Sequence, residues 1–248
     1  MARLNSAQII RVADAQALAQ TAALTFQQSA SEASAARGRF AVALSGGSTP
    51  KAMFALLAGE PYRSAIDWTR VYIFWGDERC VPPEHPDSNY RMTNEALLAR
   101  VPIPPSHIFR MRGEDEPSQA AQQYAALLQQ FFQPEDVPRF DLVFLGMGAD
   151  GHTASLFPGT TALHAAPDEI VVANYVEKLN AHRLTLTATA INQARNIVFL
   201  VGGADKAETL RAVLHGAYQP ELYPSQLIQP AQGKLIWIVD ETAAAGLS

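Results

Sequence analysis

Short apolar runs recur along the chain and predict buried β-strands. Five runs of mostly β-branched and aromatic residues are each followed by a glycine-rich or acidic segment: Phe40–Leu44, Val71–Trp75, Leu142–Leu145, Ile197–Val201 and Leu235–Val239. An uninterrupted apolar run of this length is typical of a strand that is covered on both faces, as in a parallel sheet.

Stretches with helical character lie between or before these runs. They cover Asp14–Ala36, Pro50–Leu57, Asn89–Ala99, Ser118–Phe132 and Ala204–Leu214. Strands that alternate with helices predict an α/β fold of the doubly wound, Rossmann-like kind, with a mainly parallel sheet and helices on both of its faces.

Two further strand-like segments, Glu169–Val176 and Arg183–Thr189, follow each other without a helical stretch between them. The second segment alternates between leucine and threonine, which predicts one antiparallel edge segment. The proline-rich stretches at 101–105 and 134–138 are interpreted as loops because the α/β pattern resumes after each of them. We therefore expect one domain over residues 1–248.

Composition narrows the possible functions. The chain has 248 residues, a net charge of −5 and a sequence pI near 5.7, so it lacks the broad basic face that nucleic-acid binding requires. The N-terminal residues show no leader-like apolar core, and no apolar run approaches membrane-spanning length, which predicts a cytoplasmic protein without a membrane partner. The single cysteine, Cys80, excludes an intrachain disulfide and a cysteine-based zinc cluster.

Polar motifs follow several of the predicted strands, at the edge where open parallel sheets bind ligands. The first is SGGSTP at residues 45–50. Its glycines allow close backbone approach, and Ser48 or Thr49 is expected to cap the following helix, whose free N–H groups favour an anion such as phosphate. An ordinary tight turn with a helix cap explains this motif equally well.

The second motif is WGDER at residues 75–79, followed by DSNY at 87–90. Arg79 is a candidate for binding phosphate or stabilising an oxyanion, and Asp77 for accepting from sugar hydroxyls or holding Arg79. Taken alone, the motif is better explained as an exposed loop with a local ion pair.

The third motif, GMGADGHTAS at 146–155, carries Asp150 and His152 in a glycine-rich turn. Histidine has an ordinary pKa of about 6.5, close to what a general base needs at neutral pH. Glycines leave the imidazole little to pack against, so a catalytic role is favoured over a core position, with Asp150 orienting the ring or the substrate.

Two cations complete the candidate site. Lys206, in GGADKA, would lie in the first turn of a helix, where a cation is unfavourable unless an anion binds there. Arg183 opens the alternating strand and could reach a phosphate. An exposed, solubilising role is the alternative for both residues. The six histidines form no HxH or HExxH pair and no GxSxG occurs, so neither a metal site nor a serine triad is predicted.

Together, SGGSTP, WGDER, DSNY, GMGADGHTASLFPG and GGADKA resemble the 6-phosphogluconolactonase family over Phe40 to Leu214. The resemblance implies hydrolysis of 6-phospho-D-glucono-1,5-lactone to 6-phosphogluconate, in the oxidative pentose phosphate pathway, without metal or organic cofactor. It also implies a monomer or weak homo-oligomer whose partner is a small phosphorylated sugar lactone. The site residues implied are His152 and Asp150 for catalysis, and, for substrate binding, Gly46, Gly47, Ser48, Thr49, Asp77, Arg79, Asn89, Arg183 and Lys206.

Two alternatives stay open. Glucosamine-6-phosphate deaminase/isomerases resemble this family and carry a glutamate shortly after the Asp-Gly-His turn, where this chain has Ser155-Leu156-Phe157-Pro158 without a carboxylate. A sugar-phosphate-binding regulator would need a DNA-binding module, for which the chain has neither room nor suitable charge.

Overall fold

A six-stranded parallel sheet forms the centre of the computed structural model, which describes residues 7–135 and 137–247. The strands are β1 (Gln8–Val12), β2 (Phe40–Leu44), β3 (Val71–Trp75), β5 (Leu142–Gly146), β8 (Asn196–Val201) and β9 (Lys234–Asp240). Their order in the sheet is β1-β9-β8-β5-β2-β3. All five predicted strands are confirmed. The sequence prediction missed β1, a half-exposed edge strand without a continuous apolar run. Residues 1–6, part of the segment in which we expected no leader, lie outside the described residues.

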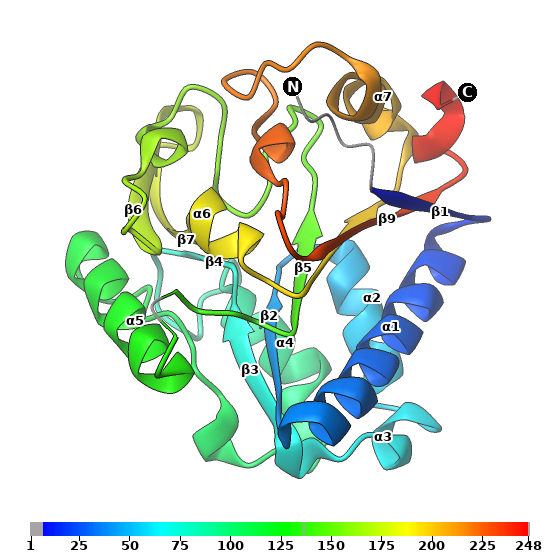
Figure 1. The fold of residues 1–248 in the computed structure, drawn as a ribbon, viewed down its shortest axis with the longest axis vertical. Coiled ribbons are helices and arrows are strands. Elements are labelled where there is room, and N and C mark those ends of the chain that lie inside the picture. The colour runs from blue at the N-terminus through cyan, green and yellow to red at the C-terminus, as the bar shows by residue number, and fades with distance from the viewer. Residues whose placement is uncertain (1–6, 136, 248) are drawn as a thin grey trace.

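Helices cover both faces of this sheet, as predicted (Figure 1). The buried residues form two cores, because alternate residues of each strand point to opposite faces. The helices are α1 (Ala15–Arg37), α2 (Ser48–Leu57), α3 (Tyr62–Ala65), α4 (Asn89–Ala96), α5 (Pro117–Phe132), α6 (Ala188–Asn192) and α7 (Ala207–His215). Val42 packs with α1 and α2 on one face, whereas Ala41 and Ala43 pack with α5 on the other.

The strand order reverses between β2 and β5. From β2 the chain continues outward to β3, whereas from β5 it continues in the opposite direction to β8 and β9. The loops that leave β2 and β5 therefore separate and open a crevice at the carboxyl ends of these two strands. SGGSTP follows β2 and GMGADGH follows β5, so the reversal places both motifs at this crevice.

The antiparallel segments form a separate sheet rather than an edge of the main one. Strand β4 (Asp77–Arg79) pairs with β7 (Ala181–Leu186), which pairs with β6 (Val171–Val176). The prediction of an antiparallel pair is confirmed, but its placement at the edge of the main sheet is wrong. Gly76 separates β3 from β4, and its carbonyl accepts from the Leu186 N–H, so the chain leaves the parallel sheet at that point.

The second antiparallel strand is also shorter than predicted. It ends at Leu186, and the Thr187 hydroxyl then accepts from the Ala190 N–H and caps α6. Threonine is a good helix cap as well as a good strand residue. The alternation of leucine and threonine therefore led us to place the end of the strand too late in the chain. Across residues 7–135 and 137–247, none of the helices combines the length and the apolar character that crossing a bilayer requires.

Candidate active site

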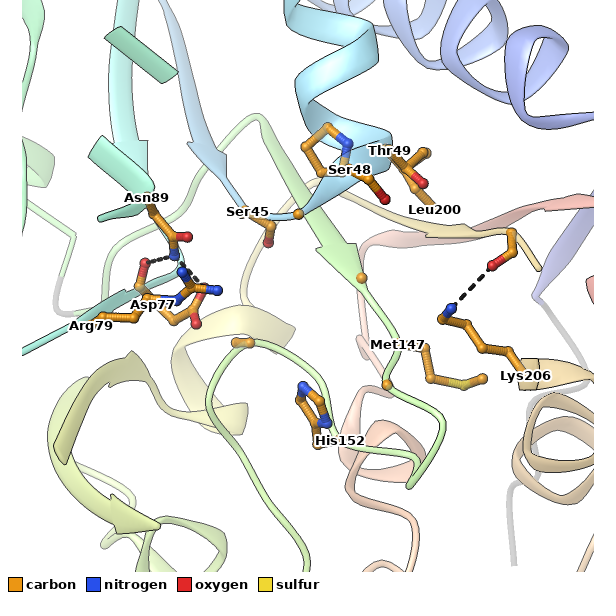
Figure 2. Close-up of a pocket in the computed structure, with 17 residues that line it drawn as sticks. Ser45, Ser48, Thr49, Asp77, Arg79, Asn89, Met147, His152, Leu200 and Lys206 are labelled. Atoms are coloured by element: carbon orange, nitrogen blue, oxygen red, sulfur yellow. Dashed lines mark hydrogen bonds between the residues drawn. The ribbon is translucent and has the colours of Figure 1, made fainter. Parts of the chain in front are cut away.

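A cavity opens at the carboxyl ends of β2 and β5 and collects most of the predicted site residues (Figure 2). Nine of the predicted residues line it: Gly46, Gly47, Ser48, Thr49, Asp77, Arg79, Asn89, His152 and Lys206. They come from five separate segments of the chain. Asp150 and Arg183 do not line the cavity, and each contacts or faces a residue that does.

His152 is held by its own turn. Gly151 has a φ of 78°, a conformation that glycine adopts without strain, and the Gly148 N–H donates to the His152 carbonyl at 2.9 Å. The imidazole stacks on Phe157, with 4.1 Å between the ring centroids. Its Nδ1 lies 2.5 Å from Asp150 Oδ1. Because a carboxylate only accepts, Nδ1 carries the proton and Nε2 keeps its lone pair.

The environment of His152 keeps the imidazole neutral. Burial lowers the pKa of His152 to about 4, with the positive charges of Arg183 and Arg79 acting in the same direction and Asp77 opposing them. The Asp150 carboxylate also favours the protonated ring through its contact with Nδ1. Near pH 7 the imidazole is therefore an unprotonated base that faces the cavity.

The first turn of α2 lies exposed at the cavity. Gly47, with a φ of 111°, is the N-cap residue, and no side chain caps this helix within the described chain. Our expectation that Ser48 or Thr49 caps α2 is therefore wrong, since both residues lie inside its first turn. The consequence favours the binding role, because the free N–H groups and the positive end of the helix dipole remain available to an anion.

Asp77 and Asn89 form the wall of the cavity that faces Lys206 (Figure 2). Asn89 Nδ2 donates to the Asp77 carbonyl at 2.9 Å, and the Ser155 hydroxyl donates to Asp77 Oδ2 at 2.8 Å. A Cβ on Gly46 would lie 1.9 Å from Asn89 Oδ1. Glycine at position 46 is therefore required for close packing of the α2 loop against this wall.

Glu78, which is buried and does not line the cavity, holds the residues of this wall in place. The sequence prediction missed this role. Its buried carboxylate accepts from the N–H groups of Arg79, Asn89 and Tyr90 and from the Ser88 hydroxyl. Burial raises the pKa of Glu78, and these hydrogen bonds oppose the rise. The carboxylate thus joins β4 to the N-terminus of α4, and this brings Asp77 and Asn89 together.

Two arginines lie directly opposite each other on neighbouring strands of the small sheet. Arg79 of β4 is the register partner of Arg183 of β7. Arg79 Nη1 donates to the Asp87 carbonyl, and neither arginine has an ion-pair partner within the described part of the chain. Burial and the charge of Arg79 lower the pKa of Arg183. Directly opposed like charges are unfavourable, so the pair is suited to a bound anion.

Lys206 lies across the cavity from Arg79, with His152 between them (Figure 2). It ends the 3₁₀ turn Ala204–Lys206 immediately before α7, rather than lying within the α-helix as expected. Its ammonium donates to the Gly202 carbonyl at 3.1 Å and lies 3.2 Å from the exposed Asp205 carboxylate. Among the described residues, no cluster of three or more His, Cys, Asp or Glu residues has the arrangement of a metal site.

Comparisons with known proteins identify the family of this chain. The sequence profile of the family described as glucosamine-6-phosphate isomerases/6-phosphogluconolactonase matches residues 13–237. The chain belongs to this family. A 6-phosphogluconolactonase from Synechocystis sp. is 46% identical over 219 residues, which cover 87% of this chain and 88% of the relative.

Solved structures of the family have the same fold. The 6-phosphogluconolactonase from Trypanosoma brucei superimposes with a TM-score of 0.85 at 28% identity, over 98% of this chain and 99% of that chain. A monomeric glucosamine-6-phosphate deaminase superimposes with a TM-score of 0.82 at 18% identity, over 96% of this chain and 99% of that chain. The second likeness shows that the deaminase branch of the family shares the fold.

Proposed function

We propose that this chain hydrolyses 6-phospho-D-glucono-1,5-lactone to 6-phosphogluconate, as the lactonase members of its family do, with His152 activating water. The observation that supports the mechanism is the position of the His152 imidazole, which Asp150 holds at Nδ1 and which faces the same cavity as the exposed first turn of α2 and the Lys206 ammonium. One cavity thus contains a base that can activate water and, apart from it, a site for the phosphate of the substrate.

Binding of the phosphate positions the lactone. The first-turn N–H groups of α2, the Lys206 ammonium and one arginine of the Arg79–Arg183 pair bind the 6-phosphate. The Asp77 carboxylate and the Asn89 amide oxygen accept from the sugar hydroxyls, since the Asn89 amide nitrogen already donates to Asp77. Because the phosphate is distant from C1, its binding energy serves to hold the ring in place for attack.

His152 then carries the proton through the reaction. Nε2 removes a proton from water as the water oxygen bonds to C1, and a tetrahedral oxyanion forms. Arg79 or an N–H of the 146–151 turn stabilises this oxyanion, which typically contributes about 3 kcal/mol. When the bond between C1 and the ring oxygen breaks, His152 returns the proton to that oxygen. The product is an open-chain acid, and no covalent bond between enzyme and substrate forms.

The test is a lactone-hydrolysis assay on freshly made substrate, corrected for spontaneous hydrolysis. We expect His152→Ala to lower kcat by about 10²- to 10⁴-fold, while 6-phosphogluconate binds with nearly unchanged affinity. If His152→Ala is poorly folded, His152→Gln keeps the size and polarity of the side chain. A fully active His152 variant would exclude His152 as the base, and a wild-type protein without lactonase activity would refute the proposed function itself.

The second candidate is a glucosamine-6-phosphate deaminase/isomerase reaction, which ammonia release from glucosamine 6-phosphate would reveal. The aromatic ring of Phe157 covers one face of His152 and no carboxylate occurs between Ser155 and Pro158. This chain therefore lacks the acidic group expected there for ring opening. The cytoplasmic location, the single-domain organisation over residues 1–248 and the monomeric or weakly homo-oligomeric state stay predictions.

A further inference from the structure

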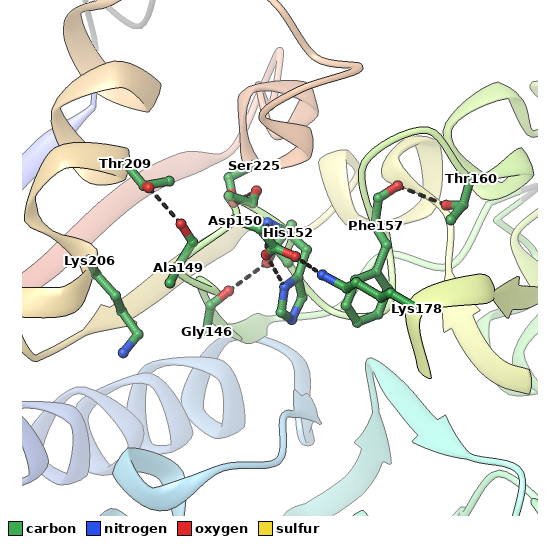
Figure 3. Close-up of polar contacts among 12 residues, drawn as sticks. Gly146, Ala149, Asp150, His152, Phe157, Thr160, Lys178, Lys206, Thr209 and Ser225 are labelled. Atoms are coloured by element: carbon green, nitrogen blue, oxygen red, sulfur yellow. Dashed lines mark hydrogen bonds and ion pairs between the residues drawn. The ribbon is translucent and has the colours of Figure 1, made fainter. Parts of the chain in front are cut away.

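A lysine outside the cavity contacts both groups that hold His152 (Figure 3). Lys178 lies in the 3₁₀ turn Glu177–Leu179, which joins β6 to β7. The small antiparallel sheet therefore places Lys178 beside Asp150. Its ammonium donates to Asp150 Oδ2, the carboxylate oxygen that does not contact His152. The same ammonium lies 4.8 Å from the centroid of the Phe157 ring.

These contacts constrain His152 in two directions. Asp150 fixes the edge of the imidazole at Nδ1, and Phe157 fixes its face. Lys178 contacts both groups: it forms an ion pair with Asp150 and a cation–π contact with Phe157. We propose that Lys178 is a positioning residue for the His152 base. This inference rests on the proposed function.

Lys178 is too exposed for its ion pair to contribute much to the stability of the fold, which separates a positioning role from a structural one. Its side chain is 52% exposed, and ion pairs at such exposure add little to protein stability. The ammonium can still act on His152, because it shares the Asp150 carboxylate with the imidazole. A positive charge on that carboxylate weakens its attraction for a second proton on the ring.

The charge of Lys178 therefore helps to keep His152 neutral. The charged groups that face His152 are Asp150 and Lys178 on the Nδ1 side, and Asp77, Arg79 and Arg183 across the cavity. Lys178→Met keeps most of the length of the side chain and removes the charge together with the N–H donor to Asp150. Asp150 then acts on the imidazole without compensation, so the pKa of His152 rises and the ring loses part of its support.

The experiment compares Lys178→Met, Lys178→Arg and the control Lys234→Met, which removes an exposed lysine at the start of β9. For Lys178→Met we expect kcat to fall at least about threefold with KM changed less than about twofold. The acidic limb of the kcat/KM profile, which reports the free enzyme, should move to higher pH by about half a unit to one unit. Lys178→Arg should restore the limb, Lys234→Met should change neither value, and Tm should change by less than about 2 °C in all three variants.

Three results would overturn the proposal. Wild-type kcat and an unmoved limb in Lys178→Met would show that the contacts have no effect on the base. Equal loss in Lys178→Met and Lys178→Arg, or a loss that follows a lowered Tm, would indicate a merely structural role. Because wild type and His152→Gln are assayed together with these variants, failure of the lactonase function itself would appear in the wild type and be distinguished from failure of this inference.

Discussion

Gly148→Ala should displace His152, the proposed base, because the atoms nearest to the new Cβ belong to His152 and Asp150 rather than to the phosphate-side residues. A Cβ at position 148 would lie 2.1 Å from His152 Nδ1 and 2.7 Å from Asp150 Oδ1. To reach the 3.4 Å at which ordinary contact begins, the ring must move by roughly 1.3 Å. Gly148 does not have a positive φ, so the backbone accepts alanine and the perturbation is steric.

The magnitude follows from this displacement. A misplacement of about 1 Å at a catalytic group typically costs about 10²-fold in rate, so we expect kcat to fall by about that factor. Moving the ring also weakens its hydrogen bond to Asp150 and its stacking on Phe157. Together these losses lower the free energy of unfolding by about 1–3 kcal/mol, which for a chain of this size lowers Tm by several degrees and leaves the protein folded.

The assay measures kcat and KM for lactone hydrolysis beside the dissociation constant of 6-phosphogluconate. Gly59→Ala is the matched control, because its Cβ would meet no atom closer than 3.6 Å and Gly59 lies outside the cavity. We expect the control to behave as wild type. A Gly148→Ala protein with wild-type kcat would refute the reasoning, since it would show that catalysis does not depend on where His152 lies.

Three further predictions test the electrostatics of the site. Lys206→Ala should raise KM by about 10- to 100-fold, the cost of one charge-assisted hydrogen bond, with kcat nearly unchanged; an unchanged KM would place the phosphate elsewhere. Arg183→Met should raise KM and also raise Tm, because burial and the nearby Arg79 make the Arg183 charge unfavourable in the folded state; a lowered Tm with unchanged KM would contradict this. Because the imidazole must be unprotonated to act as a base and burial lowers the pKa of His152 to about 4 in the free protein, kcat/KM, which reports the free enzyme, should lose the contribution of this base only as the pH drops below about 5. A pKa of His152 near 6.5 in the free protein would show that the ring is not held in a desolvated site.

Local patterns were sufficient to predict most of the elements and the central residues of the site. The five apolar runs became β2, β3, β5, β8 and β9 because a strand covered on both faces has no polar positions. Asp150 and His152 are two residues apart in one turn, so their contact follows from local geometry. Ser48, Thr49 and Lys206 could be placed at the cavity because each follows a predicted strand at its carboxyl end.

Other features depended on contacts between distant segments. The predicted helix cap at Ser48 or Thr49 was wrong because Gly47 takes that position, and the antiparallel edge was wrong because Gly76 directs the chain into a second sheet. Glu78 lies in WGDER and Ser155 in GMGADGHTAS, but neither motif indicated a role for them, since a serine or glutamate that holds a neighbour has no distinctive spacing. Their function became visible only through hydrogen bonds to Asp77 and to the start of α4.

The sequence alone determined five strands of the main sheet and the glycine turns, and it singled out His152 as the candidate base, since these depend on periodicity and on residues close together in the chain. Only the tertiary structure decided that the imidazole is desolvated, that Arg79 opposes Arg183, and that Lys178 reaches Asp150 from another sheet. The physical reason is that burial and charge interactions depend on distance in space, which residue spacing along the chain does not specify.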